Sequence, residues 1–347
     1  MGKKYDIYMN SLEKSGLENV AKLMAISASP AIFDKRMIFL DKCPICKSER
    51  IMKWGKKCLV QRETPLDLAD AEDQFLLSRL NKTNLVRSIY YCRSCTFLFQ
   101  NPTYTEDELQ NIYKSEGINT LHYYKAVGKS SEQLWDSPIA HQNIEKRKAF
   151  YASMILSLGG SIILDYGGGS GINLTHPSLN KKERYVYDFG KDEHYYAKGI
   201  SPIMLLDDDN RFDFILCTHV LEHETDPLST FQKLRKVIKP HGHLFLEIPF
   251  DFSERIISRR PGAIWHINYF NRKSIIEIAK RSGWLCQWIR LNYMPYTKDH
   301  LLCIAAFFKP ELKSTIKRQS VTRIQVIYDM IKCLSKRLRD SFLSSIN

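Results

Sequence analysis

The sequence predicts a doubly wound α/β fold, in which helices cover both faces of a mostly parallel sheet. Three observations lead to this prediction. Short β-rich runs alternate with helical patterns over residues 140–310. Several of the runs, such as residues 212–218, are apolar throughout, as in strands that are buried on both faces. A glycine-rich loop directly follows the first of these strands, at residues 167–171. Strands and helices that alternate in this way give a doubly wound sheet.

The individual elements follow from composition and from capping residues. Strands are expected at residues 161–166, 183–188, 201–206, 212–218, 243–250, 285–291 and 301–309. Helices are expected at residues 11–24, 105–116, 144–158, 226–238 and 271–283, with a further helix after the glycine loop. Asp226 with Pro227 and Asn271 are suitable residues for helix starts, and Gly159 and Gly283 for helix ends.

Bulk composition describes a globular protein of 347 residues, with 44% hydrophobic and 26% charged residues. The formal charge is +13, but the tail from Lys309 onward contributes nine Lys/Arg against three acidic residues. The remaining charge is spread thinly, which makes nucleic acid an unlikely partner on charge grounds. The sequence contains neither an apolar run of membrane-spanning length nor a secretory signal, and Asp6 does not fit a myristoylation signal. We therefore expect a cytoplasmic protein.

Four of the nine cysteines form two C-x-x-C pairs, Cys43 with Cys46 and Cys92 with Cys95. Two tight turns that each present two sulfur atoms are what a tetrahedral four-thiolate zinc site requires. The prediction is a structural zinc ion, because four thiolates leave no open coordination position. A redox pair at "CPIC" and four unrelated reduced cysteines are the alternatives.

The stretch "IILDYGGGSG" suggests the chemistry of the main ligand. A carboxylate at Asp165, directly before the glycines, would repel a pyrophosphate, whereas it suits a ligand with an ammonium and a sulfonium group. Asp188 ends the next strand, where a carboxylate can bind ribose hydroxyls. Gly167, Gly169 and Gly171 let the backbone approach a ligand closely. Together these residues favour S-adenosylmethionine.

"LDYGGGSG", "YDFG", "FDFILCTHVLEH" and "GHLFLEIP" resemble, in order and spacing, the motifs of class I S-adenosylmethionine-dependent methyltransferases. The resemblance covers about residues 140–310 and implies a Rossmann-like sheet of seven strands. It also implies how the cofactor is bound. The methionine end would lie at Asp165, Gly167 and Gly169, the ribose at Asp188, the adenine at Leu206 and Asp207, and the methyl group near Thr218 and His219. Tyr166 departs from the small or aliphatic residue that is usual there, and we expect it to cover the cofactor.

The resemblance extends to the cysteines, because methyltransferases of sugars and related small metabolites often carry such an N-terminal module. Four segments follow: a helical extension at 1–42, a zinc-binding module at 43–104, a methyltransferase domain at 105–310 and a basic amphipathic helix at 311–347. Three roles are open for this helix: binding to an anionic membrane, docking on the protein's own core, or dimer formation. Docking is the default, and the oligomeric state is left open.

Two histidines are candidates for catalysis on the acceptor side. His219 ends the fourth strand, and His266 lies in "WHINYF", which resembles the H-x-x-Y-F of the family. Either can act as a base or bind the substrate, although a histidine can also simply fix a loop. Arg255, Arg259 and Arg260 are candidates for binding a phosphate or carboxylate of the substrate.

Two motifs support rival interpretations. "HVLEH" matches the H-x-x-E-H of one zinc peptidase class, but Pro227 follows too soon for the long helix that such a site needs. "NPTY" at 101–104 resembles the N-P-P-Y of base methyltransferases, but it precedes the glycine loop, and we interpret it as a turn.

The sequence as a whole favours methyl transfer to a small polar metabolite. A phosphorylated or nucleotide-linked sugar of a surface polysaccharide pathway is the preferred acceptor, with O- or C-methylation. An RNA base methyltransferase with a zinc module and a non-catalytic cofactor-binding scaffold are the alternatives.

Overall fold

The computed structural model describes residues 38–55, 58–61, 84–108, 138–188, 196–259, 266–293 and 302–311. The expected helices at 11–24 and within 311–347 lie outside these residues, as does most of the expected helix at 105–116. At the start of that last helix Thr105 Oγ1 accepts a hydrogen bond from Glu108 N, and Glu108 Oε2 accepts one from Thr105 N. This is a capping box.

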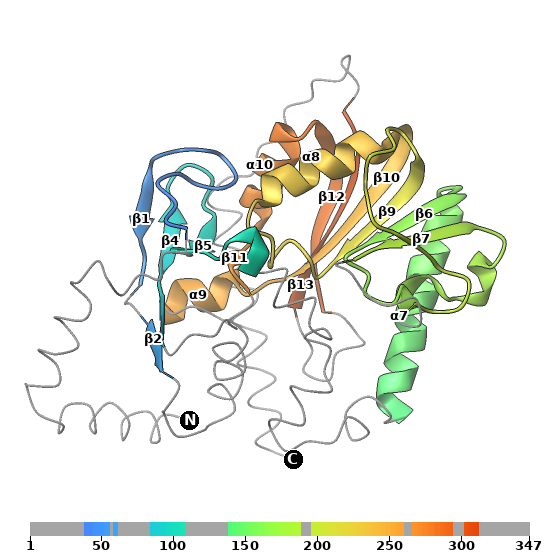
Figure 1. Cartoon of the computed structure of the whole chain (residues 1–347), viewed down its shortest axis with the longest axis horizontal. Helices are drawn as coiled ribbons and strands as arrows, with labels where there is room; N and C mark the ends of the chain where they lie inside the picture. Colours follow the sequence, from blue (N-terminus) through green and yellow to red (C-terminus); the bar gives the residue numbers. More distant parts are fainter. Residues whose placement is uncertain are drawn as a thin grey trace, which may run out of the picture. The chain divides into compact units, whose positions relative to one another are not determined.

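Seven strands form the main sheet, in the order β12-β13-β10-β9-β6-β7-β8 (Figure 1). Their bounds are β6 Ile162–Tyr166, β7 Glu183–Tyr187, β8 Ser201–Ile203, β9 Phe212–Thr218, β10 Ile238–Pro249, β12 Trp284–Tyr293 and β13 Leu302–Pro310. Neighbouring strands are parallel along the run β10-β9-β6-β7-β8. Strand β13 is antiparallel to both its neighbours, β10 and β12. The predicted α/β sheet is confirmed. Its strand order reverses at β6, between β7 and β9, and ligands of such sheets bind at the carboxyl ends of the strands near this point.

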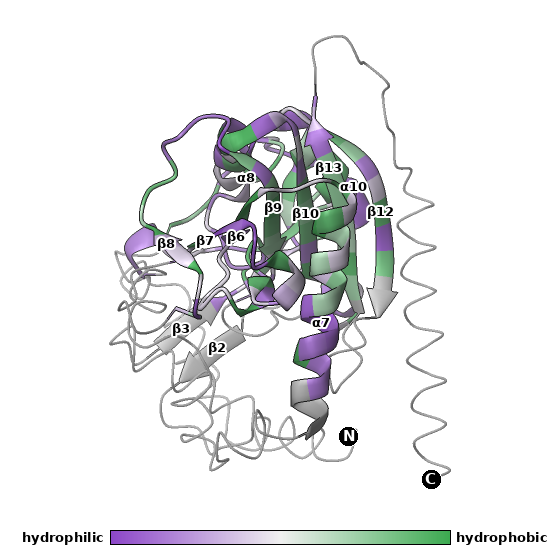
Figure 2. Ribbon diagram, turned by 90° about the vertical axis from the view of Figure 1, so that its right-hand side faces the viewer, coloured by the Kyte–Doolittle hydropathy of each residue, from purple (hydrophilic) through white to green (hydrophobic). Residues whose placement is uncertain are grey.

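Alternate residues of the central strands pack against different helices. Phe214 and Leu216 of β9 belong to the same core cluster as Tyr151 of α7 (Pro138–Ser157). Ile215 and Cys217 belong to the cluster that contains residues of α8 (Pro227–Val237) and α10 (Arg272–Arg281). Because successive strand residues point to opposite faces, the sheet is covered on both sides. Figure 2 shows the hydrophobic residues concentrated along β9, β10 and β13.

The predicted helix starts are present. The side chain of Asp226 accepts a hydrogen bond from Ser229 N, and Pro227 is the first residue of α8. Asn271 caps α10 in a capping box with Ser274, and Gly283 follows the helix with φ 71°. None of the described helices has the length and apolar character that a bilayer crossing requires.

Two parts of the prediction for the main domain were wrong. The glycine loop leads into two 3-10 turns, η2 (Ile172–Leu174) and η3 (Pro177–Leu179), where we expected an α-helix. Pro177 has no N–H to donate, so a helix starting at Ile172 could not continue through it. In addition, a short helix that was not predicted, α9 (Phe252–Ser258), follows β10.

The cysteine module has its own sheet, in the order β1-β4-β5-β11. Three strands come from the module itself: β1 Ile51–Lys53, β4 Ile89–Cys92 and β5 Leu98–Gln100. Strands β2 (Cys58–Gln61) and β3 (Asn84–Arg87) form a separate antiparallel pair. The fourth strand, β11 (Asn268–Tyr269), comes from the segment between α9 and α10 and lies antiparallel to β5. The hydrophobic core of the module is continuous with the cluster under α8 and α10.

Asn271 links helix α10 to the cysteine module, which yields a stability prediction. Its Oδ1 caps α10 by accepting from Lys273 N and Ser274 N, and its Nδ2 donates to Thr96 O at 2.7 Å. We expect Asn271→Ala to lower the free energy of unfolding by roughly 2–4 kcal/mol, because both the cap and the buried bridge are lost. Asn271→Ser keeps a capping oxygen and should lose about half as much. Urea unfolding followed by circular dichroism measures both; equal losses in the two variants would contradict the capping role.

Candidate functional site

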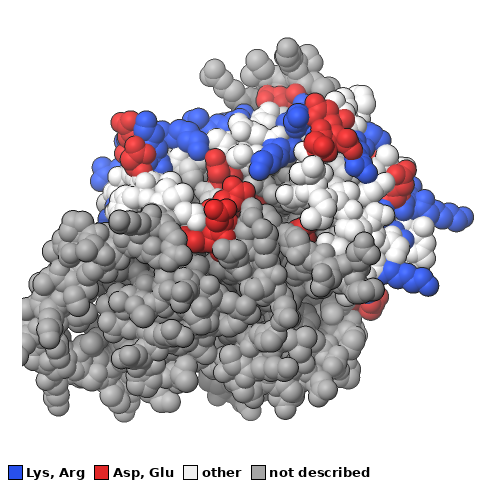
Figure 3. Space-filling view, viewed as in Figure 1, with Lys and Arg blue, Asp and Glu red and all other residues white. Residues whose placement is uncertain are grey.

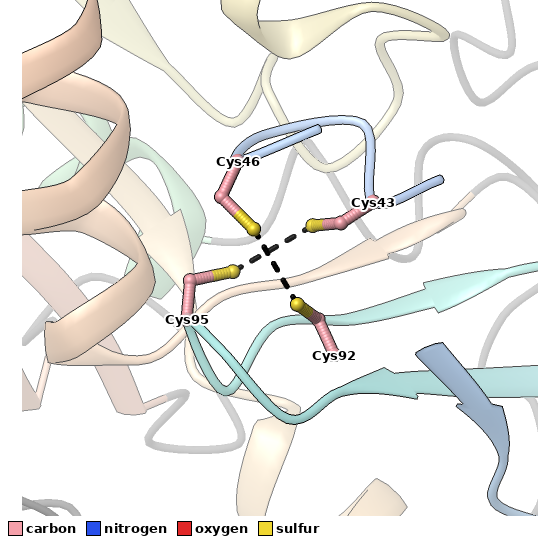
Figure 4. Close-up of side chains that lie close together, drawn as sticks. All are labelled: Cys43, Cys46, Cys92 and Cys95. Carbon is pink, nitrogen blue, oxygen red and sulfur yellow. Dashed lines mark hydrogen bonds between the residues drawn. The ribbon is translucent and has the colours of Figure 1, made fainter. Parts of the chain in front are cut away.

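The four paired cysteines meet at one point, as Figure 4 shows. The Sγ atoms of Cys43 and Cys95 are 3.6 Å apart and those of Cys46 and Cys92 are 3.5 Å apart. Both C-x-x-C turns have the same backbone bonds: Lys47 N donates to Cys43 O, and Thr96 N donates to Cys92 O. All four side chains are buried and unoxidised.

This donor set fits a tetrahedral zinc ion. The four sulfur atoms lie within 4.8 Å of one another, as ligands of a single ion must. Hydrogen bonding within the cluster lowers the pKa of Cys46 to about 7 and lowers that of Cys92, and it raises the pKa values of Cys43 and Cys95, so the four thiols share their protons as one group. The predicted zinc module is therefore compatible with the observed geometry.

The glycine loop after β6 leaves no room for side chains. A Cβ atom at Gly168 would lie 2.3 Å from Cγ of Asp165, and one at Gly167 would lie 2.4 Å from Cγ2 of Val220. Gly167 also has φ 68°, in the left-handed region that favours glycine. The loop thus folds closely over the end of β6 and presents bare backbone at the switch point of the sheet.

Asp165 lies beneath this loop with 0% of its surface exposed. Its Oδ2 accepts a hydrogen bond from Asn173 Nδ2 at 3.1 Å, while Oδ1 has no hydrogen-bond partner among the described residues. Burial raises the pKa of Asp165 to about 7, despite the hydrogen bond from Asn173. A cationic group placed at Oδ1 would satisfy the orphaned oxygen, and the ammonium of S-adenosylmethionine is such a group.

The other predicted cofactor residues follow the neighbouring strands. Asp188 comes directly after β7, and its Oδ2 accepts from Gly169 N at 2.6 Å, so this carboxylate also fixes the glycine loop. Leu206, half-buried, and Asp207, exposed, follow β8 at the edge of the sheet. Tyr166 is buried: its ring stacks on Tyr187 and its hydroxyl donates to Glu224 Oε1 at 3.2 Å.

His219 follows Thr218 at the end of β9, in a left-handed conformation with φ 56°. Its Nε2 lies 3.1 Å from Glu247 Oε1 and its Nδ1 lies 3.6 Å from Glu222 Oε1. Burial lowers the pKa of His219, but the carboxylates of Glu222 and Glu247 outweigh this and raise it to about 10. The imidazole is therefore protonated at neutral pH and can donate hydrogen bonds.

His266 lies just before β11, with its Nδ1 2.7 Å from Asp251 Oδ2. The backbone fixes this position, because Ile267 N and Asn268 N both donate to Glu222 O, in the turn after β9. The turn is not helical, so "HVLEH" lacks the helix of a peptidase site. The structure thus places both His219 and His266 beside Glu222.

Sequence reasoning missed two acidic residues of this cluster, Asp251 and Glu247. Asp251 follows β10 directly, at the edge of a parallel sheet where functional side chains gather, and this position was an available signal. Glu247 was signalled by being a lone charge within the apolar strand "HLFLEIPF". The arginine candidates lie elsewhere: Arg255 pairs with Glu254, the guanidinium of Arg259 stacks 5.5 Å from the Trp54 ring, and Arg260 is outside the described residues.

The strand order, the antiparallel β13 and the glycine loop define the class of S-adenosylmethionine-dependent methyltransferases with a Rossmann-like sheet. Residues 141–287 match the model of a family described as a methyltransferase domain. The predicted class is confirmed.

The chain is also similar to curated and solved proteins. It is 31% identical over 80 residues to the ubiquinone biosynthesis O-methyltransferase of Haemophilus ducreyi, covering 22% of this chain and 34% of that protein. It is 24% identical over 180 residues to the protein of the same name from Colwellia psychrerythraea, covering 46% of this chain and 73% of that one. The chain thus spans about a third of the length of the first relative. The 1,6-didemethyltoxoflavin-N1-methyltransferase structure from Burkholderia thailandensis aligns with a TM-score of 0.44, at 14% identity over 65% of this chain and 96% of that one.

The cysteine cluster yields a metal-content prediction. Cys46→Ser should lower the bound zinc by about one ion per chain, because a serine oxygen is a poor substitute for a thiolate ligand. The melting temperature should fall with it. Cys286→Ser, the same change at a buried thiol outside the cluster, should retain the zinc. Elemental analysis by mass spectrometry measures the metal, and unchanged zinc in Cys46→Ser would exclude a four-thiolate site.

Proposed function

We propose that the protein transfers a methyl group from S-adenosylmethionine to a small polar acceptor. One observation carries the proposal: a methyltransferase domain holds a buried carboxylate with an orphaned oxygen, Asp165, directly beneath a glycine loop at the switch point of its sheet. When bound, the cofactor supplies an electrophilic methyl group on a cationic sulfur.

The cofactor would lie across the ends of β6, β7 and β8. Asp165 takes the ammonium of the methionine end, and the backbone of Gly167 and Gly169 lies beside that end. Asp188 binds the ribose hydroxyls, and Leu206 and Asp207 flank the adenine. The support for these roles is the position of each residue at the carboxyl end of its strand, together with the fit of the loop.

The acceptor would lie at the ends of β9 and β10, beside Thr218, His219 and His266. Methyl transfer is an in-line displacement, so the protein's main task is to align the nucleophile with the methyl group. Protonated His219, held between Glu247 and Glu222, contributes a positive charge beside the acceptor. His266, held through Nδ1 by Asp251, presents Nε2 to the acceptor.

A sugar or nucleotide-linked sugar remains the proposed acceptor, supported by the sequence resemblance of the cysteine module to that of sugar methyltransferases. The names of the curated relatives support an alternative of the same reaction type, O-methylation of an aromatic hydroxyl as in a ubiquinone precursor. O-methylation is common to both and is the preferred reaction. On the part of the described surface that Figure 3 draws in colour, basic and acidic side chains are interspersed, which does not favour a nucleic-acid acceptor.

The decisive experiment supplies the protein with methyl-labelled cofactor and fractionated cell extract, followed by mass identification of labelled products. Label in a nuclease-resistant small molecule is the expected result. Label in nuclease-sensitive material would replace the proposal by RNA methylation, and cofactor binding without transfer to any fraction would indicate a scaffold. Asp188→Ala should lose transfer, whereas Asp209→Ala, at an exposed carboxylate, should retain it.

Asp165 makes cofactor binding dependent on pH. Below about pH 7 the buried carboxyl is protonated and must lose its proton when the ammonium binds. The affinity for S-adenosylhomocysteine should therefore rise with pH by up to about tenfold per unit and level off above pH 7. Calorimetry in two buffers of different ionisation enthalpy should also detect the released proton at pH 6.

The Asp165→Asn variant is the control for this pH dependence. It removes the titrating group while keeping the size of the side chain, so it should bind the product weakly and with a flat pH profile between pH 5 and 8. A wild-type affinity that does not change over this range would contradict the role given to Asp165.

A further inference from the structure

Glu222 is a buried carboxylate that pairs with protonated His219 but accepts no hydrogen bond from the described residues. Only 3% of its side chain is exposed, and neither carboxylate oxygen has a hydrogen-bond partner among the described residues. The ring nitrogens His219 Nδ1 and His223 Nε2 each lie 3.6 Å from Oε1, beyond hydrogen-bond distance. Burying a carboxylate in this way is unfavourable unless a cation or donors compensate it.

Two imidazoles complete the arrangement around this carboxylate. Ligand atoms of Glu222, His223 and His266 all lie within 4.8 Å of one another, which is close enough for one ion to contact all three. The rings of His223 and His266 approach at 4.9 Å between centroids, with their planes inclined by 64°. The two ring nitrogens and one carboxylate oxygen are the ligand set of a facial triad, which binds first-row transition metals.

Asp251 strengthens the comparison with a metal centre. A histidine ligand commonly donates its second ring N–H to a carboxylate, which fixes the ring and makes the binding nitrogen more basic. His266 Nδ1 makes such a contact with Asp251 Oδ2 at 2.7 Å, so Nε2 is the nitrogen that remains for an ion.

The backbone holds the three ligands in place. Glu222 and His223 lie in the turn after β9, and His266 lies in the segment before β11. Asn268 joins the two segments, because its backbone N donates to Glu222 O and its Nδ2 donates to Leu221 O at 2.9 Å. The side chains of His223 and His266 are 19% and 18% exposed, so the cluster has an open side.

We propose that Glu222, His223 and His266 bind a divalent first-row transition-metal ion, such as Mn²⁺, Co²⁺ or Zn²⁺, at the acceptor end of the site. This ion is separate from the zinc of the cysteine cluster, since nitrogen and oxygen ligands differ from thiolates in metal preference. Its role rests on the proposed function: the open coordination positions would receive acceptor oxygens, which favours an acceptor with two neighbouring oxygen atoms. His266 then acts as a ligand.

The test uses the full-length protein as purified, with its cysteine site filled, and Mn²⁺ alone as the probe. Mn²⁺ prefers nitrogen and oxygen ligands to thiolates, so its electron paramagnetic resonance signal reports on this cluster and not on the cysteines. We expect about one Mn²⁺ to bind per chain. Glu222→Gln and His223→Gln should weaken binding by at least tenfold, and Asp251→Asn by roughly 10–100-fold.

His241→Gln is the matched control, because His241 is exposed on β10 and lies outside the cluster. Binding of S-adenosylhomocysteine by each variant verifies that it has folded. If neither Mn²⁺ nor Co²⁺ binds, or if Glu222→Gln binds them as the wild type does, the metal site is overturned. Metal binding without methyl transfer would support the site but count against the proposed function. Methyl transfer by a protein that binds neither ion would support the proposed function and overturn the metal site.

Discussion

The shared strand β11 is the constraint on which the acceptor side of the molecule depends. The chain leaves the main sheet after β10 and returns to it at β12. Between these strands it completes the sheet of the cysteine module, where Asn268 pairs with Phe99 and Tyr269 with Leu98. Gln100 N donates to Ile267 O at 2.8 Å, directly after His266. The position of His266 is therefore set by pairing with the sheet of the cysteine module, so the module supports the proposed acceptor site.

Buried carboxylates organise the carboxyl edge of the main sheet. Asp165 and Glu247 are fully buried, and Glu222 is nearly so. Each is tolerated only with a compensating charge or donor. Glu247 is compensated by protonated His219 at 3.1 Å, whereas Asp165 and Glu222 both have oxygen atoms that lack hydrogen-bond partners within the described chain. These two carboxylates mark the places where cationic ligands are expected, one on the cofactor side of the sheet and one on the acceptor side.

The sequence predicted those features that local chemistry determines. The β9 bounds, the caps of α8 and α10 and the glycine loop all depend on residues that are neighbours in the chain. The two paired turns of the cysteine cluster could also be predicted, because metal ligands have characteristic spacing. Strand β11 could not, since two residues give no periodic pattern and the strand exists only because β5 offers an unpaired edge. For the same reason the sequence did not indicate that Asp251 lies beside His266, a contact that requires α9 and β11 to be placed first.

The extent of the family match bears on how the acceptor should be inferred. The match covers residues 141–287, which include the glycine loop, Asp188 and the strand ends that form the proposed cofactor site. The cysteine module precedes it, and yet the module fixes the acceptor side through β5, through Thr96 and through Trp54, whose Nε1 donates to Ile256 O of α9. The residues of the proposed cofactor site thus lie within the matched domain, whereas the proposed acceptor site is supported by a segment outside it. The acceptor is therefore better inferred from the cluster around Glu222 and its support by the module than from the names of relatives that share the matched domain.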